Sequence, residues 1–330
     1  MTAFFFEYGL FFAKSLTVVV SVILVIAAIT ALKHSQDADD TLQIHSLNEY
    51  YENQRERLYE EILDKKSLKA QRKEQKKAAK AKEEQQKPRI FILDFDGDIE
   101  ASAVTQLREH ISAVIQVANQ EDRVLLRLES GGGLVHAYGL ASSQLARLRD
   151  KQIPLTICVD KVAASGGYMM ACLADELIAA PFAILGSVGV VGALPNFNEL
   201  LKQHHIRYEQ HTAGEHKRSL TLFGENTDAD RRQFCHELNM THDLFKNHIK
   251  HYRPQLDIDA IATGETWYGT QAIENYLIDA VGTSDDYILA HLHSHHLVQL
   301  EEAVTQGWLE KLKQRFLGKI YTHPATTRIH

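Results

Sequence analysis

Cysteine is scarce in this chain of 330 residues, and its scarcity excludes two kinds of site. Cys158, Cys172 and Cys235 are too few and too scattered for a disulfide scaffold or a cysteine-based zinc site. An excess of positive charge is also lacking, since the formal net charge of -7 argues against a nucleic-acid partner. With 45% hydrophobic and 24% charged residues, the composition excludes wholesale disorder and collagen-like repeats. The length allows about two domains of ~150 residues, or one core with appendages.

Charge is missing altogether from the run Leu16 to Leu32 near the N-terminus. Aromatic and aliphatic residues from Phe4 to Phe12 extend the apolar character past Lys14. Because about 20 helical residues cross a hydrocarbon core of ~30 Å, the run predicts an uncleaved transmembrane anchor over residues 1–34. A cleaved signal peptide fits less well, since no Lys or Arg precedes Lys14 and no A-x-A site follows. A buried core helix is the other alternative, and the flanking charges leave the orientation undecided.

Glycine and proline are absent from residues 47–87, which are rich in Glu, Lys, Gln and Ala. An apolar stripe at helical spacing occupies the first half, but no large apolar residue occurs between Leu68 and Ile90. We therefore expect residues 35–88 to form a charged stalk, a helix that degrades into a solvated spacer. Contact between its basic part and anionic lipid is the alternative.

From Pro88 onward, apolar runs alternate with segments of helical periodicity. The predicted strands are Ile90–Phe95, Arg123–Leu128, Leu155–Val159, Glu176–Ala180 and Ile184–Val191. The predicted helices are Ala103–Val117, Gly133–Leu148, Ser165–Leu173, Asn196–His205 and Asp228–His251. This order predicts an α/β core with largely parallel strands over residues 89–295. Residues 296–330 would add a C-terminal tail, in which Leu300 to Ile320 has the pattern of a basic amphipathic helix that packs on a membrane, a partner or its own core.

Two glycine-rich turns follow predicted strands, where ligands of open α/β sheets gather. In the first, Ser130 to Gly133, consecutive N–H groups could cradle an anion or an oxyanion, or the turn could be purely structural. A phosphate loop is disfavoured because its motif is missing. The second turn, Ala163 to Tyr168, places Ser165 at the start of a predicted helix, either as a nucleophile or as an N-cap. It does not match the G-x-S-x-G elbow.

A serine nucleophile needs a base, and composition does not single one out. There are 18 histidines, most of them in surface-like helices or in the tract from His291 to His296. Lys217, followed by Arg218, is a different candidate. A lysine acts as a base only where burial or cationic neighbours leave its amine uncharged. The alternative is an ordinary surface lysine.

Three motifs taken in order resemble the signal peptide peptidase A family of membrane-anchored serine peptidases, and most closely its SohB-type inner-membrane members. They are Ala163 to Tyr168, Gly186 to Val190 and Ala213 to Arg218, within a similarity that runs from about Ile90 to Ile288. The resemblance implies a Clp-protease/crotonase-like layered fold and a Ser–Lys dyad. The implied roles are nucleophile for Ser165, general base for Lys217, supporting hydroxyl for Ser187, and oxyanion-hole donors for Gly132, Gly133 and Gly166. Gly131 departs from the family, which has proline there.

The resemblance also implies an activity, a cellular location and a set of partners. It points to a serine endopeptidase of the bacterial inner membrane, single-pass, with its peptidase domain in the periplasm and no metal or cofactor. Its expected partners are membrane lipid, copies of itself in a ring, and peptide or protein substrates such as remnant signal peptides or misfolded membrane proteins. Lys217 could then serve the Ser165 of a neighbouring protomer. A crotonase-like acyl-CoA enzyme and a non-catalytic membrane scaffold remain the alternative functions.

Overall fold

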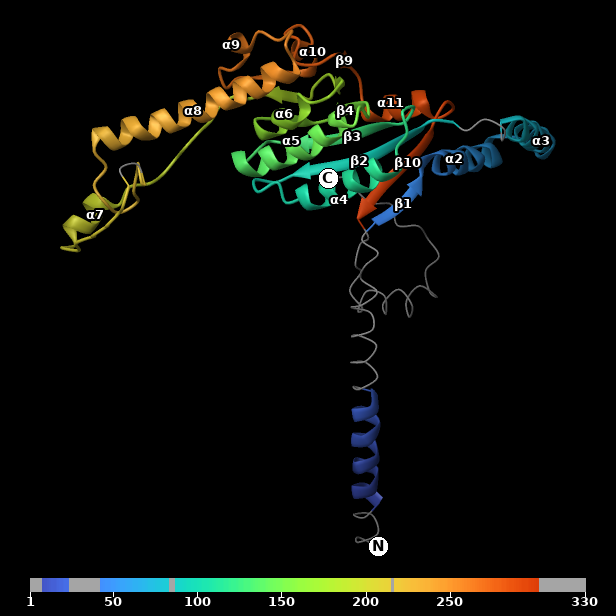
Figure 1. Ribbon diagram of the computed structural model, residues 1–330. Coiled ribbons are helices and arrows are strands. Elements are labelled where there is room, and N and C mark those ends of the chain that lie inside the picture. Colours follow the sequence, from blue (N-terminus) through green and yellow to red (C-terminus); the bar gives the residue numbers. More distant parts are fainter. Residues whose placement is uncertain (1–7, 24–41, 83–86, 215–216, 303–330) are drawn as a thin grey trace. The chain divides into compact units, whose positions relative to one another are not determined.

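The computed structural model describes residues 8–23, 42–82, 87–214 and 217–302, in two units. One unit comprises Met1–Gln43 and Glu301–His330, and the other is Ile44–Leu300. The main described element of the first unit is a helix over residues 8–23 (Figure 1). Residues 1–7 and 24–34 of the predicted membrane anchor lie outside the described residues. Within the described ranges, no helix combines the length and the apolar character that crossing a membrane requires.

The remaining elements follow one another along the second unit and its borders. The strands are β1 (Leu42–Ser46), β2 (Arg89–Gly97), β3 (Arg123–Ser130), β4 (Leu155–Val159), β5 (Val162–Ala164), β6 (Glu176–Ala179), β7 (Ile184–Gly186), β8 (Thr266–Tyr268), β9 (Ala280–Val281) and β10 (His296–Glu302). The helices are α2 (Leu47–Ile62), α3 (Lys65–Lys82), α4 (Val104–Val117), α5 (Val135–Asp150), α6 (Gly166–Ala171), α7 (Asn198–Gln203), α8 (Asp228–Tyr252), α9 (Ile258–Ile261), α10 (Gly269–Ala272) and α11 (Ser284–His291).

The strands form one sheet in the order β1-β10-β2-β3-β4-β6-β9, with β5, β7 and β8 as a branch from β3. The pairings from β10 to β9 and those of β5 are parallel, whereas β8 joins β7 in antiparallel fashion. Parallel strands need both faces covered, and β4 is accordingly buried along its whole length. The predicted α/β core with largely parallel strands is confirmed.

Alternation along the strands builds a core on each face of the sheet. Ile90 and Ile92 of β2 point to one face and pack with Tyr287 and Ile288 of α11, while partly buried residues of α2 lie against the same cluster. The residues between them are also buried, so they fill the opposite face, where α4 contacts β2 and α6 contacts β3. Figure 1 shows α4, α5 and α6 grouped beside the central strands.

The structure differs from the sequence expectation at both ends of the core. Asn48 of α2 donates to the carbonyls of Leu292 and His295 and accepts from the N–H of Leu297, which fixes the start of α2, within the predicted stalk, to the core. The second half of that stalk is the helix α3 as far as Lys82. At the other end, β10 adds a parallel strand beside β2. The helix predicted from Leu300 is therefore wrong for its first residues, and residues 303–320 lie outside the described part.

Helix α8 is attached to the core by its C-terminal half alone. Its buried residues are Phe245 and Ile249, and His248 Nε2 lies 3.0 Å from the carbonyl oxygen of Met169 in α6. The N-terminal half has no buried residue and carries the segment with α7, which Figure 1 places at the end of α8 away from α6. We call residues 191–227 the arm. None of the arm's described residues is buried.

A buried carboxylate fixes the start of β2. Asp122 is fully buried and accepts hydrogen bonds from the backbone N–H and the guanidinium of Arg89, at 2.6 to 3.2 Å. It also accepts from the N–H of Asn119 at 2.8 Å. Burial acts to raise the pKa of Asp122, but the hydrogen bonds and charge of Arg89 outweigh it, so the pKa lies below its ordinary value of 3.8.

Replacing this carboxylate should cost stability in a pH-dependent way. Because its folded pKa is lowered, Asp122 stabilises the protein above the ordinary carboxyl pKa, and this contribution disappears as the pH falls through the folded value. We expect Asp122→Asn to lower the free energy of unfolding by about 2–3 kcal/mol at pH 7, and by much less at pH 3, in urea titrations. The exposed Asp259→Asn is the control. An equal loss at both pH values would show that ionisation of Asp122 is not the source.

Candidate active site

Three segments of the candidate site meet because the strands that precede them are paired. Ser130, the last residue of β3, is paired with Ala163 of β5, and Ala164 is paired with Gly186 of β7. Parallel pairing aligns the carboxyl ends of neighbouring strands. The glycine turn after Ser130, the turn at Ser165 and the residue Ser187 are therefore brought to one edge of the sheet.

Ser165 occupies an unusual backbone conformation between β5 and α6. Its φ of 51° and ψ of -117° lie outside the regions that ordinary L-residues prefer. Its N–H donates to the carbonyl of Gly186 at 2.8 Å, and its carbonyl accepts from the N–H of Met169 at 2.9 Å. The side chain caps no helix N–H, so the N-cap interpretation gains no hydrogen bond. Strain held in place by the surrounding structure is a feature of reactive sites.

A small pocket of about 10 Å³ lies beside Ser165. Gly133 and Gly166 also line it, and within the described residues their N–H groups have no hydrogen-bond partner. Gly166 is the first residue of α6, where an N–H has no intrahelical acceptor and favours negative charge. The pocket can thus offer two amide donors next to one hydroxyl.

Gly132 lies against the nucleophile turn but uses its amide elsewhere. Its N–H donates to Ser130 Oγ at 3.0 Å, and it does not line the pocket. Its φ of +87° suits glycine, and a Cβ there would come within 2.7 Å of Gly166 N, Ala164 O and Ser165 Cβ. The oxyanion role expected of Gly132 from the resemblance stays a prediction.

Ser187 mirrors Ser165 on the neighbouring strand. Its φ is 50°, and its N–H donates to the carbonyl of Glu265 at 2.6 Å, which ends β7 at Gly186 instead of the predicted Val191. Since Ala164 is paired with Gly186, Ser165 and Ser187 follow equivalent strand positions. The structure therefore brings these two predicted residues together. Within the described residues, neither hydroxyl makes a hydrogen bond.

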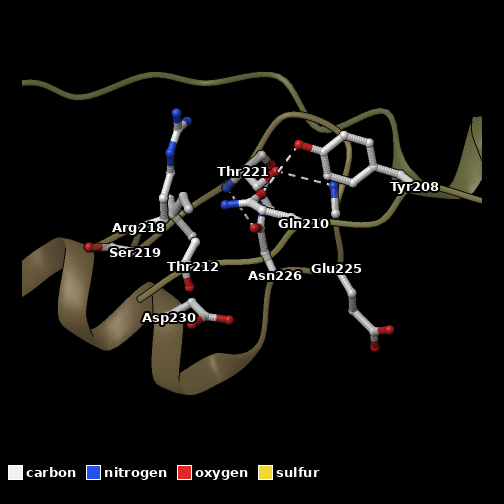
Figure 2. A pocket seen from close by; sticks show the side chains of 11 residues that line it. Tyr208, Gln210, Thr212, Arg218, Ser219, Thr221, Glu225, Asn226 and Asp230 are labelled. Atoms are coloured by element: carbon white, nitrogen blue, oxygen red, sulfur yellow. Dashed lines mark hydrogen bonds between the residues drawn. The ribbon is translucent and has the colours of Figure 1, made fainter. Parts of the chain in front are cut away.

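Lys217 is not brought to this pocket. It lies in the arm, is exposed, and its Nζ has no ion pair or hydrogen bond within the described part of the chain. The next residues, Arg218 and Ser219, line a different cavity of about 400 Å³, shown in Figure 2. Most of the labelled groups in that view are polar, and the cavity is walled by the arm and the start of α8. Among the described residues of one chain, nothing places the amine beside Ser165.

The sequence analysis missed the apolar walls of the pocket. They come from Val135, Met169, Val190 and Phe245, together with Thr241. Phe245 and Thr241 lie on α8, far along the chain from Ser165, so no local motif could assign them to the site. Burial lowers the pKa of the nearby His248, against the opposing effect of its contact with the Met169 carbonyl. Among the described residues, no cluster of three or more His, Cys, Asp or Glu side chains could hold a metal ion.

Comparison with known proteins identifies the family of the chain. The chain matches the family described as Peptidase family S49 N-terminal over residues 3–145 and Peptidase family S49 over residues 147–299. It is 44% identical over 319 residues to a Probable protease SohB of Haemophilus influenzae, covering 92% of this chain and 90% of that one. The chain belongs to peptidase family S49. The chain is a SohB-type S49 peptidase, and this result confirms the family resemblance that the three motifs indicated.

Further S49 relatives support the same conclusion. A Probable protease SohB of Buchnera aphidicola from Schlechtendalia chinensis is 48% identical over 304 residues, covering 87% of this chain and 99% of that protein. A Putative signal peptide peptidase SppA of Enterococcus faecium is 27% identical over 174 residues, about half of each chain. The mixed α/β core with its mostly parallel sheet fits the Clp-protease-like S49 fold. Membership of a peptidase family favours hydrolysis over the acyl-CoA chemistry of crotonases.

Two neighbouring glycines of the candidate site should respond differently to an added methyl group. Gly132→Ala places a Cβ against Ser165 and the Gly166 amide at positive φ, so we expect peptidase activity to fall at least ~100-fold. Gly131→Ala meets no atom within 4 Å and should keep activity near wild type. Casein hydrolysis, with circular dichroism to check folding, measures both. Comparable activity in the two variants would contradict the close approach at Gly132.

Proposed function

We propose that the protein is a membrane-anchored serine endopeptidase in which Ser165 is the nucleophile and Lys217 the general base. The observation that carries the proposal is the pocket that Ser165 lines together with Gly133 and Gly166, whose amides have no hydrogen-bond partner in the described part of the chain. The strained backbone of Ser165 supports it, because it presents the side chain at the start of α6 instead of in a cap.

The chemistry is acyl transfer in two steps. Lys217 Nζ takes the hydroxyl proton of Ser165 while Oγ attacks the peptide carbonyl, and backbone amides stabilise the oxyanion, each by about 3–4 kcal/mol. The lysine then returns the proton to the amine that leaves, and an acyl-enzyme remains. Water, deprotonated by the same lysine, hydrolyses the ester and frees Ser165. Ser187, beside Ser165 by strand register, would accept a hydrogen bond from the lysine amine and orient it.

The lysine is supplied by a neighbouring copy of the chain. Lys217 is exposed on the arm and does not line the pocket of its own Ser165. The arm also exposes apolar surface that a homo-oligomer would cover, including an aromatic cluster of Phe197, Tyr208 and Phe223 with ring centroids 5.7 to 6.0 Å apart. Contact with a second copy would desolvate the amine, which is what a lysine base requires.

The substrates are apolar peptide segments. The pocket beside Ser165 is small and is walled mainly by apolar side chains, which suits a small apolar residue next to the cleaved bond. Remnant signal peptides and misfolded membrane proteins are rich in such residues. The uncharged run from Leu16 to Leu32 would anchor the enzyme in the bacterial inner membrane, near these substrates, with the peptidase core in the periplasm.

Both members of the dyad should be required for activity. We expect Ser165→Ala and Lys217→Ala each to reduce casein hydrolysis by at least ~10³-fold, because each removes an essential partner in proton transfer. Lys202→Ala is the matched control, since Lys202 is another arm lysine, paired with Glu199 at 2.9 Å. Fluorophosphonate should label the wild type and not Ser165→Ala. Full activity in either purified dyad variant would refute the assignment.

Mixing the two inactive variants tests where the lysine acts. If Lys217 serves a neighbour, assemblies of Ser165→Ala with Lys217→Ala contain intact Ser–Lys pairs at about one quarter of the sites. Co-expression should then restore a comparable fraction of wild-type activity. Continued inactivity of co-assembled mixtures would mean that the lysine acts within its own chain.

The anchor should determine where the protein fractionates. We expect the full chain to sediment with inner membranes and to resist extraction by carbonate, because a spanning helix is held by its apolar length. A chain lacking residues 1–34 should move to the soluble fraction. A periplasm-dependent reporter fused to the C-terminus should be active in the full chain. Retention of the truncated chain on membranes would assign binding to another segment, such as the basic α3.

A further inference from the structure

A chain of hydrogen bonds lies beneath the glycine turn next to Ser165. The N–H of Gly132 donates to Ser130 Oγ at 3.0 Å, and that oxygen lies 2.5 Å from the hydroxyl oxygen of Tyr138. The Tyr138 hydroxyl donates to the carbonyl of Asp98 at 2.6 Å. Ser130 Oγ also lies 3.3 Å from the Gly97 carbonyl oxygen, which is the longer of its two possible donor contacts. Because the single hydroxyl hydrogen of Tyr138 goes to Asp98, we assign Ser130 as the donor in the shorter contact with Tyr138. The chain therefore runs in one direction, from the Gly132 amide to the Asp98 carbonyl.

The side chains of Ser130 and Tyr138, which form this series of hydrogen bonds, are shielded from water. Ser130 is 2% exposed and Tyr138 is 0% exposed. In such surroundings hydrogen bonds in series strengthen one another, and a missing partner is costly. Burial also raises the pKa of Tyr138, partly offset by its hydrogen bond with Ser130, so the phenol keeps its proton at neutral pH. The direction of the chain is thus stable under ordinary conditions.

Ser130 and Tyr138 also pack directly against the turn that carries Ser165. A Cβ built on Gly166 would lie 2.4 Å from Cγ of Tyr138, so the ring lies directly against the start of α6. A Cβ on Gly167 would lie 2.5 Å from the carbonyl oxygen of Ser130. Tyr138 and Ser130 therefore set both the position of Gly132 and the position of the Gly166 amide.

We propose that Ser130 and Tyr138 are positioning residues that hold the Gly132 amide away from the substrate, so that the Gly133 and Gly166 amides form the oxyanion hole. The inference rests on the proposed role of Ser165 and replaces one donor of the expected set. Gly133 and Gly166 line the pocket with Ser165, whereas Gly132 does not. With its N–H directed to Ser130, Gly132 contributes its positive φ, which turns the following amide toward the pocket.

Removing either hydroxyl should impair the chemical step more than substrate binding. We expect Ser130→Ala and Tyr138→Phe in the full-length protein to lower kcat and the rate of fluorophosphonate labelling roughly 10- to 100-fold, with little change in KM. The kcat of the double variant should be close to that of the less active single variant, because both substitutions interrupt the same series of hydrogen bonds. Wild-type kcat in both single variants would overturn the proposal.

Two matched controls separate positioning from general stability. Tyr168→Phe removes an equally buried hydroxyl, which donates to the Leu277 carbonyl at 2.8 Å. Ser142→Ala removes a buried hydroxyl on the same helix as Tyr138, and this hydroxyl has no hydrogen-bond partner among the described residues. Both should keep kcat within about twofold of wild type, whatever their melting temperatures. A loss of kcat in Tyr168→Phe equal to that in Tyr138→Phe would reduce the effect to stability and overturn the proposal.

Hydrogen exchange provides a readout that does not depend on activity. The Gly132 amide should exchange slowly in the wild type and in Ser165→Ala, and the Gly133 amide quickly. Tyr138→Phe and Ser130→Ala should speed exchange at Gly132. If this exchange pattern is found but fluorophosphonate does not label the wild type, the proposed function of Ser165 is refuted while the hydrogen-bond series stands. Rapid exchange at Gly132 in a labelled, active wild type would refute the positioning role alone.

Discussion

The parallel pairing of the short strand β5 between β3 and β7 is the constraint on which the candidate site depends. β5 has only three residues, yet its register aligns Ser130 with Ala163 and Ala164 with Gly186. Each of the three strands ends at this edge, and each is followed by a turn with a positive φ. Gly132, Ser165 and Ser187 supply those three conformations. A change of one residue in this register would move every candidate group to the other face of the sheet.

Close packing of backbone on backbone maintains this arrangement. Glycines at 132, 166 and 167 let the turn after Ser130, the start of α6 and the ring of Tyr138 approach within distances that any Cβ would forbid. Ser165 is the exception, since it carries a side chain at a φ that glycine would accept more readily. A residue kept in that conformation, with a hydroxyl free of local hydrogen bonds, is consistent with a chemical role.

The arm and the core differ in how their residues are stabilised. The core buries continuous strands between helices, whereas the arm exposes apolar side chains and holds Lys217 away from the pocket of its own chain. Attachment through the C-terminal half of α8 gives this segment one firm contact, where Phe245 and Ile249 are buried. In the proposed assembly, contact with a second copy would cover the apolar arm and supply Lys217 in the same step.

The sequence by itself determined the α/β class, the main strands and helices, and the family, because apolar runs and glycine motifs are local features. Ile90–Phe95 and Leu155–Val159 were identifiable as strands from their apolar runs, whereas the small residues around Ser165 left it open between a nucleophile and an N-cap until the family resemblance was considered. The three-residue strands β5 and β8 were too short for any periodicity, and β10 lay in a segment that carried a helical pattern. Only the tertiary structure decided which of the amides of Gly132, Gly133 and Gly166 are left without a hydrogen bond within the described residues. That choice depends on the hydroxyls of Ser130 and Tyr138, and hydrogen bonds between separate elements leave no periodic trace in the sequence.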